Sequence, residues 1–217
     1  MFQRAAVLAA ALVIVARPAS AQWTLGLVAA STSASTSSDG LGRLPISPVR
    51  GFAGGLSLTV PLTRNVSFAS EILYAMKGTK DKIDVYSTES SFPPNPTGTS
   101  KISYIEVPIL FRASFGSWAL RPFLTAGPEV AFKVACSFRV AGVDRFLDGT
   151  SNCSYGTYVV ESGVKSTDIG AVIGAGLCSG RLSISVRYDI GLSNSSTDPY
   201  GAYSKNRAIM AIVGITP

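Results

Sequence analysis

The sequence predicts an all-β fold, an eight-stranded antiparallel up-and-down transmembrane β-barrel, and three observations lead to it. Eight stretches alternate apolar and polar side chains with the period of two that β-strands show. Their length is close to the about 9–11 residues that a strand needs to cross a membrane. The connections between them alternate short and long, as they do in barrels of bacterial outer membranes.

Residues 1–21 are expected to form a cleavable signal peptide. Arg4 supplies a positive charge, an unbroken apolar run follows from Ala5 to Ala16, and Ala19-Ser20-Ala21 has the small residues of a cleavage site. The run is shorter than the about 20 apolar residues of a transmembrane helix. The barrel domain is therefore expected to be 22–217, exported to the bacterial outer membrane.

The first three predicted strands are Trp23 to Ala30, Gly51 to Leu62 and Val66 to Lys77. The second has its large apolar side chains at even-numbered positions and small or polar ones at odd-numbered positions. A long polar loop, 31–50, separates the first two strands, and another, 78–100, follows the third. The proline-rich part of that second loop excludes regular structure there.

The fourth and fifth predicted strands are Lys101 to Phe115 and Leu120 to about Val134, joined by a short turn. Both alternate large apolar residues with charged or small ones. The longest loop, about 135–166, follows the fifth strand. The short turn and the long loop lie at opposite ends of the fifth strand, and so at opposite rims of the predicted barrel.

The last three predicted strands are Thr167 to Cys178, Leu182 to Leu192 and Ala208 to Thr216. The seventh shows the clearest alternation in the chain, and the turn before it, Ser179-Gly180-Arg181, is short. The eighth is apolar on both faces, so its register is left open. The three short turns are assigned to the periplasmic side and the long loops to the outside.

Charged residues occur on only one face of the predicted strands, the face opposite the large apolar side chains. A charge facing lipid at mid-depth costs about 2–4 kcal/mol for Arg or Lys, so these residues are expected to point into the lumen. Because side chains fill an eight-stranded barrel and buried charges need partners, we expect a packed, structural ionic network. Its predicted members are Glu71, Lys77, Glu106, Arg112, Arg121, Glu129, Lys133, Asp168, Arg187 and Asp189.

The sequence offers little catalytic or cofactor chemistry. It has no histidine, which excludes a Ser-His-Asp triad, and no C-x-x-C pair for a metal site. The glycine-rich run from Gly170 to Gly176 lacks the lysine of a phosphate-binding loop and lies in a predicted strand. Small residues fitted to a crowded lumen explain it better. No catalytic residue, metal or cofactor is therefore expected.

The chain has three cysteines, an odd number for an exported protein. Cys136 and Cys153 flank the polar part of the longest loop, and a disulfide between them would close it. Two free thiols are the alternative, since sequence does not give the geometry. Cys178 lies within a predicted strand.

The formal charge of +6 falls to +4 when Arg4 and Arg17 leave with the signal peptide. The remaining bases are scattered, and no basic stripe with interleaved aromatic residues occurs, so nucleic acid is not an expected partner. Solvated loop charge is the preferred interpretation of these bases. Contact with anionic lipid headgroups is the alternative.

Four segments resemble strands of the PorT-like outer-membrane β-barrel family, a group of porin-family or OmpX-like small barrels. Ser103 to Leu110 resembles its Y-L-E-I-P-L-L strand, and Arg121 to Pro128 its P-Y-L-x-A-G-P strand. Asp168 to Gly176 and Arg187 to Leu192 are similar to its D-x-G-x-x-x-G-x-G and R-Y-x-x-G-L segments. The resemblance implies an eight-stranded outer-membrane barrel with a mostly undefined function.

These observations lead to a non-enzymatic outer-membrane barrel, expected to be monomeric, with a structural or surface-interaction role carried by its long loops. The expected partners are outer-membrane lipids, the barrel-assembly machinery and periplasmic chaperones. A soluble periplasmic lipocalin-like barrel with its apolar face turned inward is one alternative. A narrow pore and an outer-membrane enzyme acting on lipid are two others.

Overall fold

The computed structural model describes residues 23–39, 47–82, 97–116, 119–141, 149–152, 164–195 and 203–216. The predicted signal peptide and the proline-rich part of loop 78–100 lie outside these residues, so both stay predictions. The described residues form nine strands: β1 (Thr24–Asp39), β2 (Ser47–Pro61), β3 (Val66–Lys82), β4 (Thr97–Ser114), β5 (Arg121–Ala141), β6 (Gly149–Asn152), β7 (Thr167–Ser179), β8 (Leu182–Gly191) and β9 (Tyr203–Ile215).

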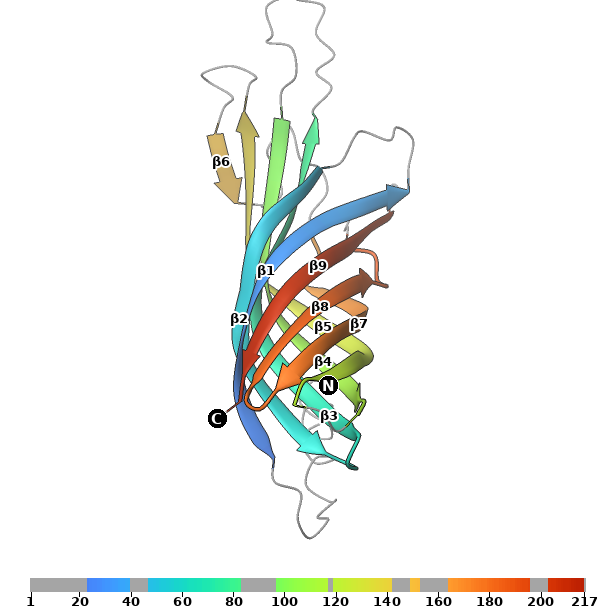
Figure 1. Cartoon of the computed structure of the whole chain (residues 1–217). Coiled ribbons are helices and arrows are strands. Elements are labelled where there is room, and N and C mark those ends of the chain that lie inside the picture. The colour runs from blue at the N-terminus through green and yellow to red at the C-terminus, as the bar shows by residue number, and fades with distance from the viewer. Residues whose placement is uncertain are drawn as a thin grey trace, which may run out of the picture.

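Eight of these strands close into an antiparallel barrel, which confirms the predicted fold class (Figure 1). Each barrel strand pairs with the next barrel strand along the chain, and β5 pairs directly with β7 because the short β6 is not one of the eight. The pairing of β1 with β9 closes the barrel. No helix among the described residues has the length and apolar character needed to cross a membrane. The tight turn between β7 and β8 is made by Gly180, whose positive φ of 54° suits glycine.

The two rims of the barrel differ. The connections from β2 to β3, β4 to β5 and β7 to β8 are short and lie at the rim where β1 begins and β9 ends, here called the short-turn rim. The opposite end is called the long-loop rim. At that rim β3, β4, β5 and β6 stand well above the other strands (Figure 1).

The apolar face of each barrel strand points outward. Large apolar side chains on that face are about half exposed, among them Leu27, Phe52, Leu56, Ile72, Ile109, Phe111, Leu124, Ile173, Ile184, Val186, Ile209 and Val213. Such an exposed apolar band is the surface of a barrel that faces lipid. A lipocalin-like barrel would bury this face, so the structure argues against that alternative.

Several strands are longer than predicted. The sequence prediction ended the first strand at Ala30 and the fifth near Val134, whereas β1 reaches Asp39 and β5 reaches Ala141. The predicted loop 135–166 also contains β6, which pairs with β5. The extension of β1 and the short β6 have small or polar residues on both faces, whereas the extension of β5 has Ser137 and Arg139 on its outer face and Cys136 and Phe138 on its inner face. Strands outside the membrane have no lipid-facing side, so these extensions lack the apolar outer face that marked the predicted strands.

Strand β9 is apolar on both faces because its inner face packs against an apolar part of the lumen. Met210 and Ile212 are buried in one cluster with Val28, Ala53, Leu73 and Ala75. The lumen is thus apolar along one side of the barrel wall, where β1, β2, β3 and β9 meet. Its charged residues lie on β3, β4, β5, β7 and β8.

Candidate functional site: the charged lumen

The ten predicted lumen residues separate into buried and partly exposed groups. Seven are buried, with at most 8 % of their surface exposed: Glu71, Lys77, Glu106, Glu129, Asp168, Arg187 and Asp189. Arg112, Arg121 and Lys133 are half-buried. The buried group contains five acids and two bases. The balance of five acids and five bases that the sequence indicated therefore does not extend to the most buried part of the lumen.

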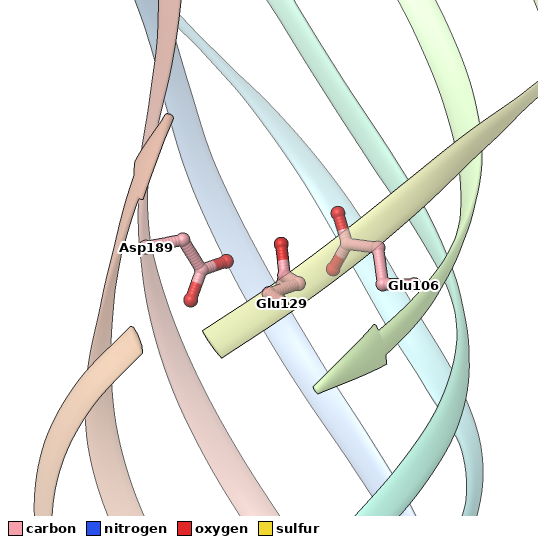
Figure 2. A group of neighbouring side chains, drawn as sticks. All are labelled: Glu106, Glu129 and Asp189. Atoms are coloured by element: carbon pink, nitrogen blue, oxygen red, sulfur yellow. The ribbon is translucent and has the colours of Figure 1, made fainter. Parts of the chain in front are cut away.

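Lys77 is the centre of the largest charged cluster. Its Nζ lies 2.6 Å from Glu106 Oε1, 3.3 Å from Asp189 Oδ2 and 3.5 Å from Glu129 Oε1. These acids come from β4, β8 and β5, and their carboxylates point toward one another inside the barrel (Figure 2). One ammonium group from β3 thus joins three other strands across the lumen.

The three carboxylates around Lys77 also form the donor set that a divalent cation prefers. One oxygen from each of Glu106, Glu129 and Asp189 lies within 4.8 Å of the others. The Lys77 ammonium already contacts all three groups. Glu106 Oε2, Glu129 Oε2 and Asp189 Oδ1 are buried and accept no hydrogen bond from the described residues. The cluster thus contains three carboxyl groups and one ammonium group.

A second buried pair lies closer to the short-turn rim. Arg187 donates from its two terminal nitrogens to the two carboxylate oxygens of Glu71, at 2.7 and 2.9 Å. This two-pronged geometry is the strongest that an Arg–carboxylate pair makes. It links β8 to β3, two strands that are not neighbours in the sheet. A cavity of about 40 Å³ lies beside it, with room for a few water molecules.

Toward the long-loop rim the lumen is polar rather than ionic. Asn206 donates from Nδ2 to Asp168 Oδ2 at 2.7 Å and to the Tyr104 hydroxyl at 3.3 Å. Ser193 donates to the other oxygen of Asp168. Asn206 precedes the predicted start of the eighth strand and was not among the predicted lumen residues. Extending the inner-face alternation of Met210 and Ala208 by two residues would have found it.

The three half-buried bases make no ion pair with a described carboxylate. Arg112 stacks on Phe123, with its guanidinium carbon 3.7 Å from the ring centroid. Arg121 donates to the Arg64 carbonyl oxygen, and Lys133 donates to the Val164 carbonyl oxygen. Their positive charges are therefore stabilised by an aromatic ring and by backbone carbonyl groups. The alternation of the sequence did not indicate these partners.

The glycine-rich stretch of β7 lines a crowded part of the lumen. A Cβ added at Gly176 would lie 2.5 Å from the Phe123 ring and 2.6 Å from Ser185 Cβ. At Gly174 it would lie 2.9 Å from Thr125 Oγ1. No larger residue fits without displacing these neighbours. This crowding agrees with the packing explanation for the stretch and not with a phosphate-binding loop.

The cysteines lie in different surroundings. Cys136 is disulfide-bonded, and Cys178 on β7 is a free thiol. Cys153 lies outside the described residues, so the pairing of Cys136 with Cys153 stays a prediction.

A family model described as "Outer membrane protein beta-barrel domain" matches residues 16–197. No curated protein matches the chain significantly. Neisserial surface protein A is 16% identical, with a TM-score of 0.45, and the match covers 89% of this chain and 98% of that one. The attachment invasion locus protein of Yersinia pestis, solved with the heparin analogue sucrose octasulfate, is 11% identical with a TM-score of 0.43, covering 90% and 99%. The N-terminal β-barrel domain of Pseudomonas aeruginosa OprF is 13% identical with a TM-score of 0.29, covering 88% and 97%. The family match spans every described strand except β9.

Proposed function

The chain belongs to the outer membrane protein beta-barrel domain family, and on that basis we propose that it is a non-enzymatic barrel whose lumen is closed by buried charge. Its place is the bacterial outer membrane. Its role is structural or surface-interacting, and the long loops carry the contacts. The finer assignment to PorT-like barrels is part of this proposal.

The Lys77 cluster is the observation that carries the proposal. Lys77, Glu106, Glu129 and Asp189 meet inside the barrel from four strands and are at least 93 % buried by side chain. Charges so deeply buried have no contact with bulk water, whereas charges lining an open pore would be hydrated. The cluster therefore supports a plug and disfavours the narrow-pore alternative.

A second observation supports a role without catalysis. The chain has no histidine. Its deeply buried carboxylates contact a lysine, an arginine or a lumen asparagine, which is the pattern of a structural network. The Ser193 hydroxyl contacts the Asp168 carboxylate, but Asn206 also donates to that carboxylate, so this contact fits the same polar network.

Planar-bilayer recording tests the proposal. Purified protein that migrates differently on gels before and after boiling, the sign of a folded barrel, should give no steady conductance. The variant K77A/E106A, which empties the centre of the plug, should conduct if it still folds by the same gel criterion. Steady conductance from the folded wild-type protein would overturn the closed-lumen proposal.

A further inference from the structure

The exposed charged side chains that the structure describes all have the same sign. Every acidic side chain that the structure describes lies buried in the lumen: Glu71, Glu106, Glu129, Asp168 and Asp189. The exposed charged side chains of the described residues are all basic: Arg50, Arg64, Lys80, Lys101, Arg139, Lys165, Arg181 and Arg207. The outer surface therefore has a positive charge that its own described acids do not neutralise.

Three of these bases gather on the strands that rise at the long-loop rim. Lys80 on β3 lies opposite Thr99 on β4, and Thr99 lies opposite Arg139 on β5. Lys101 stands two residues from Thr99 on the same face of β4. With strands about 4.8 Å apart, the three bases lie within about 10 Å of one another. Lys80, Lys101 and Arg139 are called the basic face.

A β-bulge brings Arg139 to this face. The register of β4 and β5 shifts between Ser103, which pairs with Ala135, and Tyr104, which pairs with Lys133. Below the shift Lys133 points inward, and above it the odd-numbered residues of β5 point outward. Without the extra residue Arg139 would face the inside of the sheet. Bulges re-aim side chains in this way.

The basic face begins where the apolar band ends. On β4, Lys101 and Ile105 share the outer face and lie four residues apart, about 13 Å along the strand. Between them the Tyr74 hydroxyl donates to Ser103 Oγ at 2.8 Å. A tyrosine with its ring in the apolar band and its hydroxyl on a polar partner marks the membrane–water interface. The three bases therefore lie at headgroup depth.

The basic face has no counter-charge among the described residues. Lys80, Lys101 and Arg139 are exposed and make no ion pair with a described side chain. Like charges on adjacent strands repel, which is unfavourable unless an anion lies between them. Three long basic side chains around the small Thr99 form a surface that suits a phosphate group, with Arg139 able to bind it through two nitrogens.

We propose that the basic face binds the phosphate groups of lipid headgroups in the outer leaflet, so that these bases are not merely solvated loop charge. The lipid's acyl chains would then lie on the apolar band directly below, beside Ile105 and Phe132. This proposal rests on the proposed function only in naming the outer leaflet, because the proposed function places the long-loop rim outside the cell. Phosphate recognition itself depends on the three bases.

Lipid binding to the folded full-length protein in an uncharged detergent tests the proposal, with native mass spectrometry as the readout. The probes are bis-phosphorylated lipid A and the same lipid A without its phosphates. Wild-type protein should bind the phosphorylated form more tightly. The variant K80Q/R139Q should bind it about thirty-fold more weakly than wild type, since each base near an anionic headgroup contributes about a factor of five.

The matched control is R64Q/R181Q, which removes two exposed arginines from the short-turn rim and should bind as wild type does. Each variant's fold is checked by its gel shift on heating. Equal binding of the two lipid A forms by wild-type protein would overturn the proposal without any variant. Equal losses in the two double variants would overturn the location. Bilayer conductance is unaffected by either result, so a failure here is distinct from a failure of the closed lumen.

Discussion

Lys77 Nζ and Glu106 Oε1 lie 2.6 Å apart at the centre of the lumen, and Glu106 has no exposed surface. An ion pair so deeply buried is destabilising when broken, because it leaves a charge with neither water nor partner. Lys77 is also the only cation in contact with Glu129 and Asp189 among the described ion pairs. The stability of the barrel should therefore depend strongly on this lysine.

Replacing Lys77 with methionine keeps most of the side-chain volume and removes the charge. We expect K77M to lower the free energy of unfolding by about 3–5 kcal/mol, since three buried carboxylates lose their ammonium. Urea unfolding in detergent micelles, followed by the gel shift, measures the change. K77M/E106Q should recover part of the loss. An unchanged urea midpoint for K77M would contradict the role given to Lys77.

The Glu71–Arg187 pair should show strong coupling in a double-mutant cycle. E71Q and R187Q each leave one buried partner unmatched, whereas the double variant removes both charges together. We expect a coupling free energy of about 1–3 kcal/mol from urea unfolding of the four proteins. R187K should not replace arginine fully, because lysine cannot donate to both oxygens of Glu71 in the same geometry. Additive losses would show that the pair does not act as a unit.

A charge on the outer face of β8 should prevent stable insertion. Val186 is 58% exposed on the apolar band, and V186R should cost about 2–4 kcal/mol if it lies near mid-membrane. The control is S166R, at an exposed position of the long-loop rim, which should fold as wild type does. Folding yield into lipid vesicles measures both. Equal yields for the two variants would argue that the outer face does not contact lipid.

The thiols should be distinguishable by labelling. In unreduced, urea-denatured protein one thiol should react with maleimide, at Cys178, because Cys136 is disulfide-bonded. C178A should then have no reactive thiol, and peptide mass spectrometry should find Cys136 linked to Cys153. Three reactive thiols in the unreduced wild-type protein would show that no disulfide forms.

The barrel itself could be predicted from the sequence because every strand that crosses the membrane must place an apolar side chain at each lipid-facing position, which is every second residue. Leu182 to Leu192 shows this most clearly, since each even-numbered side chain must contact lipid. Where strands leave the membrane, this constraint ends. The upper part of β5 and the whole of β6 were therefore missed. The orientation of Arg139 depends on a bulge that alternation cannot reveal.

The charged lumen could be predicted in composition but not in pairing. Alternation placed Glu71, Lys77 and Arg187 on the inner face. It gave no information on height along the barrel axis, which decides which charges meet. Lys77 thus contacts three acids, whereas Arg112 stacks on Phe123. Residues such as Asn206 join the network from a strand whose two faces are both largely apolar.

A spin-label scan of β8 from Leu182 to Gly191 tests the central claim, a lipid-facing band around a closed lumen, most directly. Nitroxides would be placed one at a time in folded protein in bilayers, after Cys136, Cys153 and Cys178 are replaced with serine. Even-numbered positions should be accessible to oxygen, which concentrates in lipid, and odd-numbered positions should be accessible neither to oxygen nor to a water-soluble nickel reagent. Access of the nickel reagent to Ser185 and Arg187 would show a water-filled pore, and its access to Ile184 and Val186 would show a soluble barrel. Either result would contradict the account.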